Sequence, residues 1–126
     1  MKPEKIHLHR RTKQLELTYA DDQHFRLDAE YLRVLSPSAE VRGHHPNQAV
    51  LQVGKKDVAI ESIIGVGNYA IQIFFDDQHD SGIYSWEYLH QLCIHHDENW
   101  QRYLDQIKQQ KKCREANTEI INAIKL

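Results

Sequence analysis

The sequence predicts an α+β fold, mainly an antiparallel β-sheet with a short helix after the third strand and helices at the C-terminus. Two observations predict it. Up to about residue 85, apolar residues mostly alternate with polar ones, which is typical of half-buried strands. After that point they recur every three or four positions, which is typical of amphipathic helices. Because strands and helices occupy separate parts of the chain, we expect antiparallel pairing and no βαβ units.

The first strands are expected in residues 5–9, 14–19 and 24–27, where apolar side chains alternate with polar ones. The charged residues 10–13 between the first two runs predict a hairpin loop. A short helix follows at residues 28–35. Asp28 is its expected N-cap, and Pro37 ends it.

Residues 49–53 and 58–75 are rich in Val, Ile and aromatic residues and predict further strands. Gly65 and Gly67 interrupt the longer run, so a bulge or tight bend is expected there. The tetrapeptide Asp-Asp-Gln-His occurs twice, at residues 21–24 and 76–79. Each copy separates two strand-like runs, and aspartate favours turns. Both copies are therefore predicted to be turns.

Ser85 is a credible helix N-cap, and Trp86, Leu89 and Cys93 lie on one helical stripe after it. "HHDEN" then predicts a break. Further apolar residues recur at helical spacing beyond the break and could contact a partner protein or a second copy of the chain. These candidate partner-binding residues are Trp100, Leu104, Ile107, Ile120, Ile121 and Ile124.

Composition limits the kinds of partner. The 126 residues carry a formal net charge of −2, which gives no bulk attraction to nucleic acid or to an anionic membrane. No apolar run approaches the roughly 20 residues of a membrane span. Two cysteines, with no signal-peptide pattern at the start of the sequence, favour a reducing cytoplasmic location. We expect a protein partner or self-association, with no nucleic acid and no membrane.

Little in the sequence predicts catalysis. Cys93 is expected to be a buried, inert thiol, and Cys113 lies in a polar stretch with no evident base. No glycine-rich phosphate loop or serine elbow is present in the sequence. His44, His45 and His79 could ligate a metal, but no zinc-binding spacing supports them. We therefore expect a protein that is not an enzyme.

The segment "IIGVGNYAIQIFFDDQHDSGIYSWEYLHQLC" resembles the hallmark of the gamma-butyrobetaine hydroxylase-like N-terminal domain family, also called DUF971. The matching positions are Gly67, Tyr69, Ala70, His79, Gly82, Ile83, Tyr84, Trp86, Leu89, Leu92 and Cys93. Tyr31, Leu32 and Arg33 match the opening of the family. The resemblance covers about residues 3 to 95, which implies a domain at 1–98 and a C-terminal helical extension at 99–126.

In dioxygenases that carry it, this domain is a non-catalytic module that holds zinc. The resemblance places the zinc ligands at three cysteines after the small helix and at the histidine of an Asp-Gly-His turn. The corresponding residues here are Ser36, Ser38, Val41 and His79, so only the histidine remains. Serine and valine do not make a structural zinc site, and we expect no cofactor. The alternative is a zinc or iron site that uses His79 with His44 or His45.

The turn itself also differs, because Gln78 replaces the glycine of Asp-Gly-His and makes a positive φ less expected. The resemblance implies a non-catalytic accessory or protein-interaction module. Relatives fused to ATPases that resemble iron–sulfur cluster carriers suggest a link to iron–sulfur protein maturation. The competing hypothesis is the metal-binding protein described above.

Overall fold

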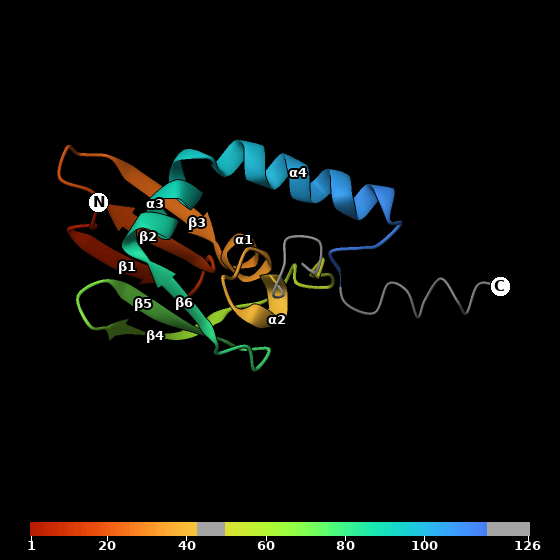
Figure 1. The fold of residues 1–126 in the computed structure, drawn as a ribbon, viewed down its shortest axis with the longest axis horizontal. Coiled ribbons are helices and arrows are strands. Elements are labelled where there is room, and N and C mark those ends of the chain that lie inside the picture. Colours follow the sequence, from red (N-terminus) through yellow and green to blue (C-terminus); the bar gives the residue numbers. More distant parts are fainter. Residues whose placement is uncertain (43–49, 116–126) are drawn as a thin grey trace.

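The computed structural model describes residues 1–42 and 50–115, and it confirms the α+β class (Figure 1). Two three-stranded antiparallel sheets, rather than one, precede the C-terminal helices. The sequence candidates His44, His45, Ile120, Ile121 and Ile124 lie outside the described residues.

The first sheet has the strand order β1-β2-β3, with β1 at Lys5–His9, β2 at Gln14–Thr18 and β3 at His24–Asp28. Leu15 and Leu17 of β2 are fully buried, whereas Glu16 between them lies on the opposite face. The alternation read from the sequence therefore gives one face to the core and one to solvent.

The second sheet has the order β4-β5-β6, with β4 at Ile60–Val66, β5 at Ala70–Phe75 and β6 at Gly82–Ser85. Gly67 has a φ of +53° in the turn between β4 and β5, as expected for a tight bend. Gly65 is instead a regular β4 residue opposite Ile71, and the register shift in this pair lies between Ile60 and Ser62.

Both copies of Asp-Asp-Gln-His form turns between strands, as predicted. Each turn is closed by a backbone hydrogen bond from the N–H of one residue to the carbonyl oxygen four residues later. These bonds run from Tyr19 N to Gln23 O and from Phe75 N to His79 O, both 2.9 Å. Each loop has three residues, and its third residue has a positive φ.

The two copies are nevertheless one residue out of phase. The positive φ falls on Asp22 (62°) in the first copy and on Gln78 (69°) in the second. The expectation that Gln78 would disfavour this conformation was wrong, because the hairpin geometry requires it whichever residue is present.

Within residues 1–42 and 50–115, four helices complete the fold: α1 at Ala29–Val34, α2 at Ala39–Arg42, α3 at Trp86–Ile94 and α4 at His96–Gln109. The Ser85 hydroxyl caps α3 by accepting a hydrogen bond from the Tyr88 N–H (3.1 Å), whereas the side chain of Asp28 makes no cap bond to α1. The predicted domain boundary at 98/99 falls inside α4.

The main core combines residues of both sheets with α1 and α3. A second, smaller cluster joins α4 to α1 through Val34, Tyr103 and Ile107. The predicted strand at residues 49–53 is absent from residues 50–53, which are irregular. Leu51 and Val53 pack against the second cluster instead, so their apolar character serves contact with α4 rather than strand pairing.

Among the helices that the structure describes, none has the length and apolar character needed to cross a bilayer.

Candidate functional site

The structure places Ser36 and Ser38, two of the positions that the resemblance matches to zinc ligands, beside His79. Ser36 and Ser38 follow α1, Val41 belongs to α2, and His79 closes the turn between β5 and β6. His79 Nε2 lies 2.8 Å from Ser36 Oγ and 3.4 Å from Ser38 Oγ. All four residues are at least nine-tenths buried. We call Ser36, Ser38 and His79 the histidine–serine corner.

The backbone next to the corner is fixed by tyrosine hydroxyls. Tyr84 donates to Leu32 O, near the end of α1, and Tyr88 donates to Leu35 O at 2.6 Å. A Cβ at Gly82 would lie only 2.7 Å from Ser36 Oγ. Glycine is therefore needed at position 82 for the serine to lie this close to β6.

An ionic network supports the turn that carries His79. Asp77 Oδ2 accepts hydrogen bonds from Arg33 Nε (2.8 Å) and Lys55 Nζ (2.7 Å), and Asp77 Oδ1 accepts one from the His79 backbone N–H (3.3 Å). Burial opposes ionisation of this carboxyl, but the hydrogen bonds from Lys55 and Arg33 and their charges outweigh it and lower the pKa of Asp77.

The corner does not fit the family's zinc. Its donor set is one imidazole and two neutral hydroxyls, whereas a structural site needs four ligands drawn from thiolates, imidazoles and carboxylates. The imidazole Nε2 is also engaged by the serine hydroxyls. Restoring a zinc site would therefore require new ligands.

The contact between Ser36 and His79 has the distance of a nucleophile and its base. However, the Ser36 side chain is fully buried, so a substrate carbonyl could not reach its hydroxyl without an opening of the fold. The two residues instead act as a polar link between the α1–α2 segment and the second sheet.

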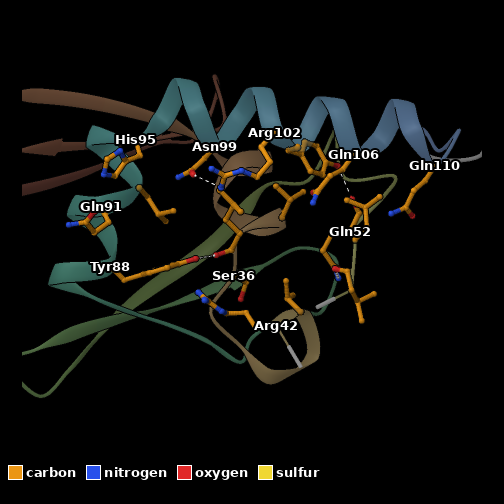
Figure 2. Close-up of a pocket in the computed structure, with 17 residues that line it drawn as sticks. Ser36, Arg42, Gln52, Tyr88, Gln91, His95, Asn99, Arg102, Gln106 and Gln110 are labelled. Carbon is orange, nitrogen blue, oxygen red and sulfur yellow. Dashed lines mark hydrogen bonds between the residues drawn. The ribbon is translucent and has the colours of Figure 1, made fainter. Parts of the chain in front are cut away.

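A pocket of about 570 Å³ lies beside the corner, between the α1–α2 segment, residues 50–52 and the two C-terminal helices (Figure 2). Ser36 belongs to both features. Apolar side chains line it from Val34, Leu35, Val41, Val50, Leu51 and Leu92. Polar side chains line it from Arg42, Gln52, Gln91, His95, Asn99, Arg102, Gln106 and Gln110.

The pocket carries two positive charges. Arg42 lies over the Tyr88 ring at 5.5 Å, and Arg102 Nη1 donates to Asn99 Oδ1 at 3.4 Å. Among the residues whose side chains the structure describes, which exclude 39 and 40, neither guanidinium has a carboxylate at ion-pair distance. The pocket therefore offers two cations to an anionic ligand.

Sequence reasoning did not find this pocket. One signal was available, because the polar residues from Gln91 to Gln110 recur at spacings of three and four, as a stripe on one side of successive helices does. The other wall could not be read from the sequence, since it comes from residues 34–42 and 50–52.

The candidate partner-binding residues within the described range face the protein itself. Ile107 is 8% exposed and packs with Val34 and Tyr103, and Trp100 and Leu104 are partly buried in the same cluster. Ile107 is thus not available to a partner in this structure. Cys93 is buried, which raises the pKa of its thiol to about 11 and disfavours the reactive thiolate.

The sequence profile described as "Gamma-butyrobetaine hydroxylase-like, N-terminal" matches residues 6–90, which is more than half of the chain. The chain belongs to this family. No curated protein matches it.

Solved structures agree with this assignment. Two NMR solution structures, each 43% identical, cover 90% of this chain with TM-scores of 0.79 and 0.76, and the matches span 90% and 84% of those chains. A crystal structure of a DUF971 family protein of unknown function from Acidithiobacillus ferrooxidans ATCC 23270 is 34% identical, with a TM-score of 0.61. That match covers 72% of this chain and 91% of the other. Residues 1–98 are about 78% of the chain, so the two NMR matches must extend beyond residue 98.

Proposed function

We propose that this chain is a non-catalytic binding module that takes an acidic segment of a partner protein into the pocket beside the histidine–serine corner. The observation that carries the proposal is the pair of arginines, Arg42 and Arg102, that line the pocket with no carboxylate partner among the side chains that the structure describes. Side-chain carboxylates of a bound segment would supply the missing negative charge through charge-assisted hydrogen bonds.

The remaining lining supports a peptide rather than a free ion. Amide side chains such as Gln91, Asn99 and Gln106 can each donate to a peptide carbonyl and accept from a peptide N–H. The apolar side of the pocket, with Leu35 and Leu51, can cover a hydrophobic side chain of the same segment. A few residues of extended chain would use all three kinds of contact.

The absence of catalysis is part of the proposal. The serine that lies closest to a base is buried, and Cys93 has a raised pKa. The cytoplasmic location stays a prediction. The link to iron–sulfur protein maturation, which the family resemblance suggests, also stays a prediction. Self-association stays a prediction as well, and light scattering of the full chain would test it.

Selection from a random peptide library tests the proposal. We expect peptides rich in Asp and Glu to be enriched, with affinity that falls as salt is raised. Arg102→Gln should weaken the selected peptides by up to about fivefold, because Arg102 is exposed and an exposed ion pair contributes at most about 1 kcal/mol. Lys108→Gln removes the same charge from α4 but lies outside the pocket, so it should leave binding nearly unchanged.

Equal losses in the Arg102→Gln and Lys108→Gln variants would show that only net charge matters and would contradict the assignment to the pocket. Failure to enrich acidic peptides would contradict the proposed ligand class. The metal-binding alternative has its own measurement. Stoichiometric zinc or iron in protein purified without a histidine tag, lost in His79→Gln, would favour it.

A further inference from the structure

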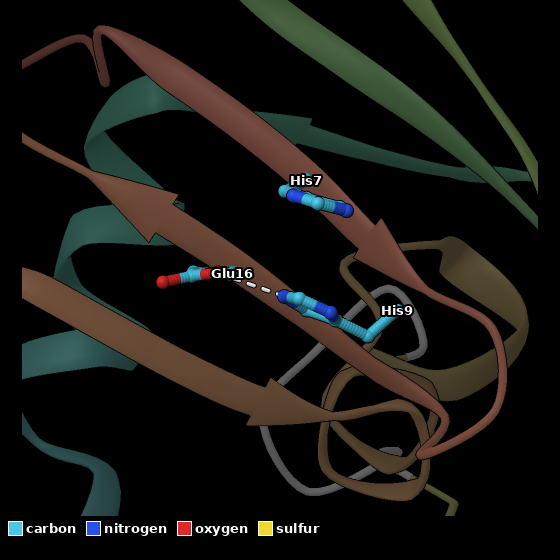
Figure 3. Close-up of side chains that lie close together, drawn as sticks. All are labelled: His7, His9 and Glu16. Carbon is cyan, nitrogen blue, oxygen red and sulfur yellow. Dashed lines mark hydrogen bonds and ion pairs between the residues drawn. The ribbon is translucent and has the colours of Figure 1, made fainter.

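Two histidines and a glutamate gather on the outward face of the first sheet (Figure 3). His7 and His9 lie two residues apart on β1 and therefore point to the same side of the strand. The antiparallel register sets Glu16 of β2 directly opposite His7. The three side chains meet because of strand alternation and register, not because of a loop.

The distances suit a shared ligand. The two imidazole rings stack with centroids 4.2 Å apart and planes 13° from parallel. His9 Nε2 lies 2.7 Å from Glu16 Oε1, and one ligand atom from each of the three residues lies within 4.8 Å of the others. Donors that share a tetrahedral ion at about 2.0–2.1 Å lie about 3.4 Å apart. The pair at 2.7 Å must move apart to reach this spacing, and pairs near the 4.8 Å limit must move closer. Side-chain rotations that displace the donor atoms by about 1 Å would do both.

Charge and access also favour a cation. The hydrogen bond from His9 is the main factor that lowers the pKa of Glu16. Burial opposes it, and the charge of Arg26, whose Nη2 lies 3.8 Å away, assists it. The side chains of His9 and Glu16 are 23% and 22% exposed, so an ion could approach from solvent.

We propose that His7, His9 and Glu16 form a binding site for a divalent late transition-metal ion. Imidazole ligands favour zinc, nickel and copper, whereas magnesium and calcium prefer sites made of oxygen alone. Water can complete the coordination in so open a site. His24 of β3 is a further candidate ligand, because its Nδ1 lies 3.8 Å from Glu16 Oε2 and its side chain is 57% exposed.

This site is separate from the family's zinc position and from the pocket. Its ligands come from β1 and β2 of the first sheet, whereas the histidine–serine corner is built from the α1–α2 segment and the turn after β5. The proposed metal site can therefore be tested independently of the proposed function.

Titration of the full, untagged chain with zinc chloride, followed through histidine ring signals by NMR and through heat by calorimetry, tests the site. We expect one equivalent of zinc to shift the signals of His7 and His9. His9→Gln and Glu16→Gln should each weaken binding by at least about tenfold, a loss typical even of changes one shell further from a metal. Melting curves in EDTA show whether each variant folds, and Glu16→Gln keeps the shape of the side chain.

His44→Gln with His45→Gln is the matched control, because it removes two imidazoles and changes no residue of β1, β2 or β3. It should bind zinc as the wild type does. The proposal is overturned if zinc causes no shift at His7 and His9. It is also overturned if binding survives unchanged in both sheet variants, or if it disappears only in the control.

Discussion

Replacing Ser36, Ser38 and Val41 with cysteine should create a zinc site with His79. The two serine oxygens already lie 2.8 Å and 3.4 Å from His79 Nε2. In a tetrahedral site, a Zn–S bond of about 2.3 Å and a Zn–N bond of about 2.0 Å put sulfur and nitrogen about 3.5 Å apart. The corner therefore has nearly the spacing of the metal site, and only its chemistry has to change.

The sign of the stability change should depend on zinc. Without metal, the larger sulfur at position 36 must fit beside Gly82, which already lies close to the serine hydroxyl, so the triple variant should lose about 1–3 kcal/mol. With free zinc 1,000-fold above the dissociation constant, binding to the folded state should add about 4 kcal/mol. For a chain of this size the added stability raises Tm by roughly 12–20 °C.

Thermal melts of the triple variant with zinc and with EDTA measure this difference, and cobalt substitution reports tetrahedral thiolate ligation by its visible spectrum. The control adds His79→Gln to the three cysteines and should bind zinc more weakly. A triple variant that folds but melts at the same temperature in zinc and in EDTA would refute the reasoning, because it would mean that these positions do not converge on one ion.

Four further variants test the turn and its supports. Gln78→Gly should stabilise the protein by about 0.5–1 kcal/mol, since glycine adopts the positive φ at this position without the steric cost of a side chain; urea unfolding measures the gain. Gly82→Ala should cost about 1–3 kcal/mol because the new methyl group overlaps the serine hydroxyl, whereas Gly65→Ala meets nothing within 4 Å and should change stability by less than about 0.5 kcal/mol. Asp77→Asn should cost about 1–3 kcal/mol at pH 7. Because the folded pKa of Asp77 is lowered, its contribution is present above the unfolded pKa of about 3.9 and is lost as pH falls through the folded value, so unfolding curves of wild type and variant should converge below about pH 4. A difference that persists unchanged at pH 2 would mean that packing, not charge, explains the loss.

Local patterns predicted the first sheet well, because one buried face is enough to determine strand alternation. Leu15, Leu17 and Leu27 are buried where the pattern placed them. The same reasoning failed for residues 50–53. Leu51 and Val53 are apolar because α4 packs on them, and a short apolar run cannot distinguish strand pairing from contact with a helix.

The candidate sites were harder to predict because they depend on long-range contacts. Ser36 and His79 are 43 residues apart, and only the family resemblance linked them before their contact was seen. The proposed metal site of His7, His9 and Glu16 was missed for a different reason. Two histidines at alternate positions of a predicted strand were a usable signal, but the contribution of Glu16 depends on the hairpin register, which the sequence left open.

The tyrosine hydroxyls that hold the end of α1 have a consequence for the protein inside a cell. Tyr84 and Tyr88 secure this loop through hydrogen bonds to Leu32 O and Leu35 O. These hydrogen bonds hold the loop to the protein's own side chains, so we expect the abundance of this chain not to fall when cells are starved of zinc or treated with a chelator.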